Sequence, residues 1–230
     1  MTNPASPLAS ITLACPWLTI QFSRTMRVLS WAIDRPGLVE ADRILWREVK
    51  NHDLPVDLDV RTWLQHEQDK NGFTNAVTML TSRSITRYEI ASAEVDEVSA
   101  LCVATVGLSN AERIGVRVDH QDKDWGTINI AVLLSEGLTE AAMLEASSIA
   151  TQARTAAICD AHYAIPTGLA TGTGTDCIAI AAPIGDTCFA GLHTAIGEAI
   201  GKSVYDAIAK AVADWIMEND PANKGTKAVS

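Results

Sequence analysis

Residues 193–217 read HTAIGEAIGKSVYDAIAKAVADWIM and carry the strongest structural signal in the chain. Apolar residues recur every four positions along one line, at Ile196, Ile200, Val204, Ile208, Val212 and Ile216. Charged residues of both signs recur at the same spacing on a second line, at Glu198, Lys202, Asp206, Lys210 and Asp214. This pattern predicts a long amphipathic helix that packs its apolar stripe on a core and exposes its charged face to water.

The segments before this helix predict two buried strands and a second long helix. Apolar runs at 127–134 and 176–182 are typical of buried strands. Residues 138–160 are rich in Ala, and Thr139 is a suitable N-cap for a helix over this range. Strands that alternate with long helices favour a sheet whose outer face the helices cover.

The first half of the chain predicts mainly strands. We expect an antiparallel meander of three short strands, a turn, a helix, and then three more strands, over residues 11–15, 17–22, 27–32, 34–37, 59–70, 76–80, 87–93 and 100–106. The last of these strands is continuously apolar and is therefore expected at the centre of the sheet. The sequence thus predicts one mixed α/β (α+β) domain over 1–230, with a β-rich N-terminal half and mixed sheets covered by long C-terminal helices. Residues 11–218 are expected to be ordered and the tail 219–230 flexible.

Composition and charge narrow the class of protein. The 230 residues include 18 Lys and Arg against 28 Asp and Glu, which gives a net charge of −10 and argues against nucleic-acid or anionic-membrane partners. The N-terminus lacks the basic and apolar regions of a secretory signal, and no apolar run approaches the roughly 20 residues that span a bilayer. The five cysteines are widely spaced and odd in number. We therefore expect a cytoplasmic protein with reduced cysteines; a homo-oligomer is left open.

Three Gly-containing segments at strand ends stand out chemically, at 106–111, 125–130 and 170–176. Each places Gly beside Thr, Ser, Asn or Asp, and loops on a rigid sheet are common places for binding and catalysis. The Gly-Thr alternation before Asp176 offers free N–H groups and hydroxyls, which suit an anion or a developing oxyanion. The same pattern is equally compatible with a tight turn. Asp176 itself precedes an apolar run, so it is expected to be half-buried and to need donors.

In this order, the three segments resemble the adenosylcobinamide amidohydrolase family. The most specific pair is Gly-Thr-Ile-Asn at 126–129 followed by Thr-Gly-Thr-Gly-Thr-Asp at 171–176. The resemblance extends over 20–215, with further matching stretches at 27–30, 79–82, 146–154 and 190–201. Many members carry Asn-Gly-Gly where this chain has Trp31 and the residues that follow it, so a substrate-facing loop is expected to differ.

The resemblance implies hydrolysis of the amide that joins the corrin ring's propionyl side chain to aminopropanol in adenosylcobinamide. The products would be adenosylcobyric acid and 1-amino-2-propanol, and the enzyme would serve cobamide salvage or remodelling. The corrinoid would be the substrate, so no cofactor is expected. No His, Cys or Asp cluster has the spacing of metal ligands, although a metal held by residues distant in sequence is left open.

Amide hydrolysis needs a nucleophile, an oxyanion stabiliser and an acid for the leaving amine. We expect Asp176 to be the base, acting on water or on the hydroxyl of Thr173 or Thr175, and His193 to be the acid or an orienting group. Direct attack by water is favoured, because an internal Thr is a weak nucleophile. The expected substrate-binding residues are Asn110, Asn129, Thr127, Gly172 and Gly174, of which the two glycines would supply oxyanion donors.

Two other functions are compatible with the same residues. One is a different amide hydrolase or acyltransferase that uses a Thr nucleophile. The other is a non-catalytic protein that binds a small anion or a corrinoid in the Gly-Thr loop.

Overall fold

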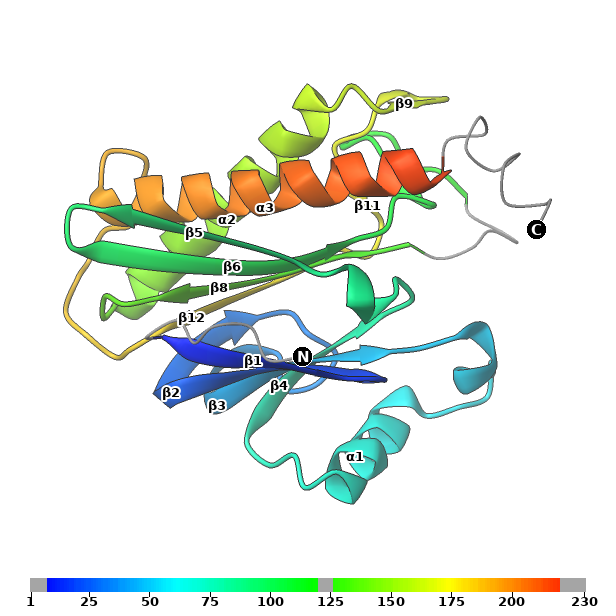
Figure 1. Cartoon of the computed structure of the whole chain (residues 1–230), viewed down its shortest axis with the longest axis horizontal. Helices are drawn as coiled ribbons and strands as arrows, with labels where there is room; N and C mark the ends of the chain where they lie inside the picture. Colours follow the sequence, from blue (N-terminus) through cyan, green and yellow to red (C-terminus); the bar gives the residue numbers. More distant parts are fainter. Residues whose placement is uncertain (1–7, 120–125, 220–230) are drawn as a thin grey trace.

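Strand β2 (Trp17–Ser30) joins the two halves of the fold. Its first part pairs with β1 (Ala9–Ala14), its last part pairs with β12 (Cys177–Ala182), and β3 (Gly37–Glu48) lies along its other edge. The pairing of β2 with β3 shifts register between Gln21 and Met26, which is the kind of irregularity that bends and twists a strand. The sheet therefore folds over on itself at β2, as Figure 1 shows.

The computed structural model describes residues 8–119 and 126–219. Its main sheet has eight strands in the order β4-β3-β2-β12-β8-β6-β5, with β1 added beside β2. The remaining strands of this sheet are β4 (Ala76–Thr81), β5 (Glu89–Val95), β6 (Val98–Val106) and β8 (Ile128–Leu134). The pairs β8–β12 and β3–β4 are parallel and the others are antiparallel, so the sheet is mixed, as the sequence predicts.

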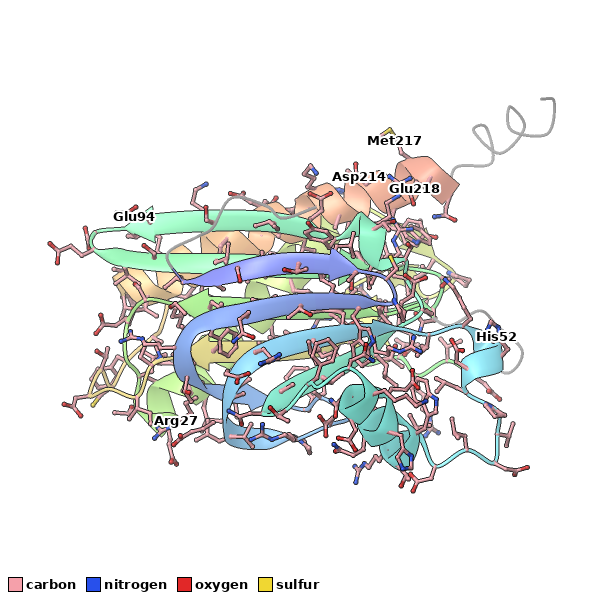
Figure 2. All side chains as sticks on the ribbon, turned by 60° about the horizontal axis from the view of Figure 1, so that its bottom comes forward. Arg27, His52, Glu94, Asp214, Met217 and Glu218 are labelled. Carbon is pink, nitrogen blue, oxygen red and sulfur yellow. The ribbon has the colours of Figure 1, made fainter. Side chains whose placement is uncertain are left out.

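The helices cover the two outer faces of the folded sheet. Helices α2 (Glu140–Asp160) and α3 (Ala195–Asn219) pack on the half that holds β5, β6, β8 and β12. The short helix α1 (Val60–Lys70) packs on the other half through Leu64, against Trp17 and Leu45. Figure 2 turns this second half and α1 towards the viewer. The prediction that long C-terminal helices cover an outer sheet face is confirmed.

A second apolar core lies between the two halves of the sheet. Ile20, Val28 and Ile44 from one half are in the same buried cluster as Val103 and Leu133 from the other. Alternate residues of β8, such as Ile130 and Val132, instead join the core under α2 and α3. Burial on both faces explains why β8 reads as a continuous apolar run.

Three sequence predictions for the first half are wrong in detail. Residues 17–22 and 27–32 form one strand, because β2 continues through its irregularity rather than breaking there. The third strand of the meander is β3, which the sequence did not predict and which follows the expected turn at 34–37. Strand β6, expected at the centre of the sheet, lies next to the edge strand β5, and β12 is the middle strand. Its continuous apolar character reflects cover on both faces rather than a central position.

Short elements complete the described chain. They are the 3-10 helices η1 (Asn51–Asp53) and η2 (Ile85–Arg87) and the strand pairs β7 (Ala111–Glu112) with β11 (Gly172–Thr173) and β9 (Ala164–Ile165) with β10 (Gly168–Leu169). None of the helices in the described ranges is both long and apolar enough to cross a membrane. Of the tail 219–230 that was predicted to be flexible, Asn219 is the last residue of α3, and residues 220–230 lie outside the described residues.

The loops that leave β8 and β12 approach each other at two glycines, which gives a test of the fold. A Cβ atom at Gly185 would lie 2.5 Å from the backbone carbonyl of Gly137. We therefore expect Gly185→Ala to lower the free energy of unfolding in urea by about 1–3 kcal/mol, as overpacking does. The control is Gly201→Ala in α3, where a Cβ meets nothing within 4 Å. It should raise the free energy of unfolding by about 0.5–1 kcal/mol through helix propensity. Equal stability of the two variants would contradict the close approach.

Candidate active site

A cleft of about 910 Å³ lies between the two halves of the sheet, where β8 and β12 begin and β3 and β4 end. The β8–β12 side contributes mainly small polar residues: Gly126, Thr127, Asn129, Gly174, Thr175, Asp176 and Cys177. The β2–β4 side is mostly apolar and contributes Trp31, Ala32, Ile33, Val49, Lys50, Leu54, Met79, Leu80, Thr81 and Ser82. The cleft is thus lined by both halves of the sheet and has one polar and one largely apolar side.

Asp176 immediately precedes β12 and lies at the centre of a hydrogen-bond network. The Thr173 hydroxyl donates to its Oδ1 at 2.5 Å, and the Thr173 backbone N–H lies 3.2 Å from both carboxylate oxygens. Arg154 reaches in from α2, and its guanidinium forms an ion pair with Oδ2. The expectation of a buried Asp served by a neighbouring Thr is therefore confirmed in its geometry.

Gly172 makes room for this ion pair. A Cβ atom at that position would lie 2.6 Å from Asp176 Oδ2 and would also overlap the Arg154 guanidinium. Gly172 is buried in β11, which pairs with β7, and it is not part of the cleft lining. Gly172 therefore lies beside the ion pair and outside the cleft lining, and the role of its amide as an oxyanion donor stays a prediction. Gly174 does line the cleft.

The protonation of Asp176 reflects two opposing influences. Its side chain is 8% exposed and that of Arg154 is 13% exposed. Burial raises the pKa of the Asp176 carboxyl because it penalises the charged form, while Arg154 and the Thr173 hydrogen bonds oppose that rise. The pKa stays above the ordinary aspartate value. A carboxyl of this kind can accept a proton more readily than an exposed aspartate does.

Reciprocal hydrogen bonds join the Gly-Thr loop to the start of β8. The Thr127 hydroxyl donates to the Thr175 carbonyl at 2.7 Å, and the Thr175 hydroxyl donates to the Gly126 carbonyl at 2.8 Å. Asn110 accepts a hydrogen bond from the Gly126 N–H at 3.1 Å. The three segments that the sequence singled out are therefore assembled into one site.

The two predicted substrate-binding asparagines have different positions. Asn129 lines the cleft, and its Nδ2 donates to the Leu80 carbonyl at 2.7 Å, which connects the two halves of the sheet. Asn110 is 2% exposed and lies outside the cleft lining, behind Gly126. Asn110 thus holds the Gly126 loop through its side-chain oxygen, and its predicted contact with substrate stays a prediction.

His193 is not brought to this site. It is exposed in the turn before α3, and the chain reaches that turn only after β12 has run away from Asp176. Figure 1 shows that α3 begins at the opposite end of the molecule from β11, the strand that comes just before Asp176 in the chain. Figure 2 labels Glu218, in the last turn of α3, at the same end as His52, which lies close in sequence to the cleft residue Lys50. The structure therefore separates His193 from Asp176.

Two residues of the site were missed by sequence reasoning. Arg154 is the one basic residue in the Ala-rich helix α2, and this isolation was the signal in the sequence for a special role. The structure shows that it points inward to Asp176. Trp31 donates from its indole Nε1 to the Asp176 backbone carbonyl at 2.7 Å. Its position in the loop that departs from the family pattern was a hint of a role in the cleft. Within residues 8–119 and 126–219, no group of three or more His, Cys, Asp or Glu could hold a metal ion.

Comparison with known proteins shows which family this chain belongs to. The family model described as adenosylcobinamide amidohydrolase matches residues 7–220. The chain belongs to the adenosylcobinamide amidohydrolase family. The match spans all three Gly-containing segments, Arg154 and Asp176. As a member of the adenosylcobinamide amidohydrolase family, the protein is a hydrolase of amide bonds.

The chain is also similar to individual proteins of known sequence or structure. It is 29% identical over 224 residues to the uncharacterized protein MJ1613 of Methanocaldococcus jannaschii, with 85% of each chain covered. Among solved structures, the PH0078 protein of Pyrococcus horikoshii is 10% identical with a TM-score of 0.46, covering 89% of this chain and 77% of that one. A beta-aminopeptidase of a Burkholderia species is 12% identical with a TM-score of 0.45, covering 91% and 81%. Likeness at this level carries no argument about chemistry.

The ion pair can be tested through the pH dependence of stability. Arg154→Met leaves the Asp176 carboxylate buried without its partner, which raises its folded pKa further. We expect a loss of about 3–5 kcal/mol in the free energy of unfolding at pH 7.5. A carboxyl whose pKa is raised in the folded state costs stability only at pH values where it is ionised in the unfolded chain. The loss should therefore shrink as the pH falls towards the pKa of an unfolded-chain aspartate, about 4.

The measurement is urea unfolding of the wild type and the variant at pH 7.5 and pH 5. The matched control is the double variant Arg154→Met with Asp176→Asn, which removes the buried charge and should remove the extra pH dependence. A loss of the same size at both pH values in the single variant would contradict the ion-pair account.

Proposed function

We propose that the protein hydrolyses the amide between the corrin propionyl side chain and aminopropanol in adenosylcobinamide. The products are adenosylcobyric acid and 1-amino-2-propanol, and the reaction serves cobamide salvage. Membership of the family supports the reaction class, and the buried, hydrogen-bonded carboxyl of Asp176, a residue that lines a 910 Å³ cleft, is the observation that carries the assignment to this site. A cleft of this size is in the range of ligand sites.

In the proposed mechanism, Asp176 acts as a base on water. The carboxylate takes a proton from the water as its oxygen bonds to the amide carbon, and the carbonyl oxygen becomes an oxyanion. The Gly174 N–H is the remaining predicted donor for that oxyanion in the cleft, and one such donor typically contributes about 3–4 kcal/mol. When the C–N bond breaks, the proton on Asp176 passes to the leaving nitrogen. One carboxyl thereby serves as base and then acid, and His193 is not required.

Arg154 and Thr173 are positioning residues in this mechanism. Both donate to the Asp176 carboxyl and fix its orientation. Arg154 also opposes the rise in the pKa of Asp176 that burial causes, which favours the ionised form that acts as a base. The buried surroundings make the protonated form accessible once water has been deprotonated.

A Thr nucleophile is the second candidate, and one contact favours it. The Thr173 hydroxyl already donates to Asp176 at 2.5 Å, as a hydroxyl activated by a base would. Thr173 is, however, outside the cleft lining, whereas Asp176 is part of it. Thr175 lines the cleft, but its hydroxyl donates to a backbone carbonyl, which cannot serve as a base. These positions favour attack by water.

The first test replaces the base. Asp176→Asn should still fold, although less stably because the Arg154 guanidinium loses its charged partner, and should lose about 10²–10⁴-fold in the rate of hydrolysis, because Asn cannot accept the proton. The assay incubates pure protein with adenosylcobinamide and follows adenosylcobyric acid and free aminopropanol by mass spectrometry. The matched control is Asp160→Asn, an exposed carboxylate on α2 bonded to Tyr205, which should keep wild-type activity. Near wild-type turnover by Asp176→Asn would remove this residue from the mechanism.

The second test distinguishes water from a Thr nucleophile. If water attacks directly, acid quenching during turnover gives only the intact chain of 24.6 kDa. A species heavier by one cobyric acyl group would establish a covalent intermediate instead. Thr173→Val adds a second readout, since it should slow the water mechanism modestly but abolish a mechanism in which Thr173 is the nucleophile. A wild-type protein that binds cobinamide without turnover would favour the non-catalytic binding function.

The third test uses pH. The base must be ionised, so kcat/KM should rise with pH through a midpoint above the ordinary pKa of an aspartate, because burial raises the pKa of Asp176. In Arg154→Lys, which keeps a positive charge but loses the planar fork of guanidinium donors, the midpoint should move to higher pH. The measurement is the pH profile of kcat/KM for both proteins between pH 4 and 8. A profile that is flat over this range would argue against Asp176 as the base.

A further inference from the structure

Trp31 is held firmly at the cleft while much of its ring stays open to solvent. It is the first residue after β2 and lines the cleft, and its side chain is 51% exposed. Its indole N–H donates to the Asp176 carbonyl at 2.7 Å. An exposed tryptophan fixed by a hydrogen bond presents a rigid aromatic surface, and such surfaces bind flat groups at low entropic cost.

The residues around Trp31 extend this surface. Ile33 and Leu54 line the same side of the cleft, and Met79 of β4 lies there fully buried. The charged residues in the described lining are Lys50 and Asp176, and each is ion-paired, with Glu48 and Arg154 respectively. This side of the cleft therefore offers apolar contact rather than free charge.

We propose that Trp31 is a stacking platform for the flat face of the substrate's macrocyclic ring. Ile33 and Leu54 continue the apolar surface beneath the ring, and the amide arm crosses to the polar side of the cleft. This inference rests on the proposed function and adds how the substrate is oriented. The ligand class that fits is a broad, planar ring with an apolar face and an amide-bearing side chain.

The hydrogen bond of Trp31 explains why the platform would serve the reaction. The indole is bonded to the backbone of the same residue whose carboxyl is the proposed base. Ring and carboxyl are therefore held at a fixed separation, and a substrate stacked on Trp31 places its side chain near Asp176. A short linear amide could not use this device, so its hydrolysis would not depend on Trp31.

The test compares Trp31→Ala with Trp31→Phe. Both variants lose the hydrogen bond to the Asp176 carbonyl, but only Phe keeps an aromatic face, so the difference between them isolates stacking. Binding of cobinamide is measured by equilibrium dialysis with its visible absorbance, which needs neither turnover nor tryptophan fluorescence. Phe189→Ala is the control, because Phe189 is 72% exposed but lies outside the cleft lining.

We expect Trp31→Ala to weaken cobinamide binding and raise KM for adenosylcobinamide about tenfold or more, as loss of an aromatic stacking partner does. Trp31→Phe should stay within about threefold of the wild type, and Phe189→Ala should match it. Any effect on kcat from the lost hydrogen bond should appear equally in both Trp31 variants.

The outcomes separate this inference from the proposed function. Wild-type hydrolysis with unchanged binding by Trp31→Ala would overturn the platform alone, and so would Trp31→Phe weakened as much as Trp31→Ala. Cobinamide binding that needs the aromatic ring, without any hydrolysis, would support the platform and overturn the proposed reaction. A wild type that does not bind cobinamide would overturn both.

Discussion

The buried ion pair between Asp176 and Arg154 is the interaction on which the site depends. It connects α2, on the outside of the sheet, with Asp176, the last residue of the loop that enters β12. Thr173 closes the loop around the same carboxyl, and Gly172 leaves the space that the guanidinium occupies. Removing one charge would leave the other desolvated, so the pair constrains loop, helix and strand together.

The folding of the sheet at β2 determines what faces this carboxyl. Because β2 pairs with β1 along its first part and with β12 along its last part, the two halves of the sheet lie face to face. The ends of β3 and β4 are thereby brought opposite the starts of β8 and β12. Asn129 links the halves through its bond to the Leu80 carbonyl. The apolar and polar sides of the cleft therefore come from distant parts of the sequence.

The long helices and most strands could be predicted because their patterns are local. Strand β3 could not, since its charged residues interrupt the apolar alternation; Arg47, for example, is 8% exposed and pairs with Glu67 of α1. The three Gly-containing segments could be singled out because each carries its own chemistry, and the structure brings them into contact. The approach of Arg154 to Asp176, and the separation of His193 from Asp176, depend on which strand ends meet. Those facts follow from topology, which no local pattern encodes.

The hydrogen bond from Trp31 ends on a backbone carbonyl, which any residue at position 176 would possess. The anchoring of the indole is therefore independent of the side chain that we propose as the base. A chain whose carboxyl has been replaced by a neutral group of the same shape should still hold its aromatic surface in place. Such a protein would suit crystallography with an intact corrinoid, because the proposed aromatic platform is held by the backbone carbonyl of Asp176 and the proposed bond cleavage uses its carboxyl.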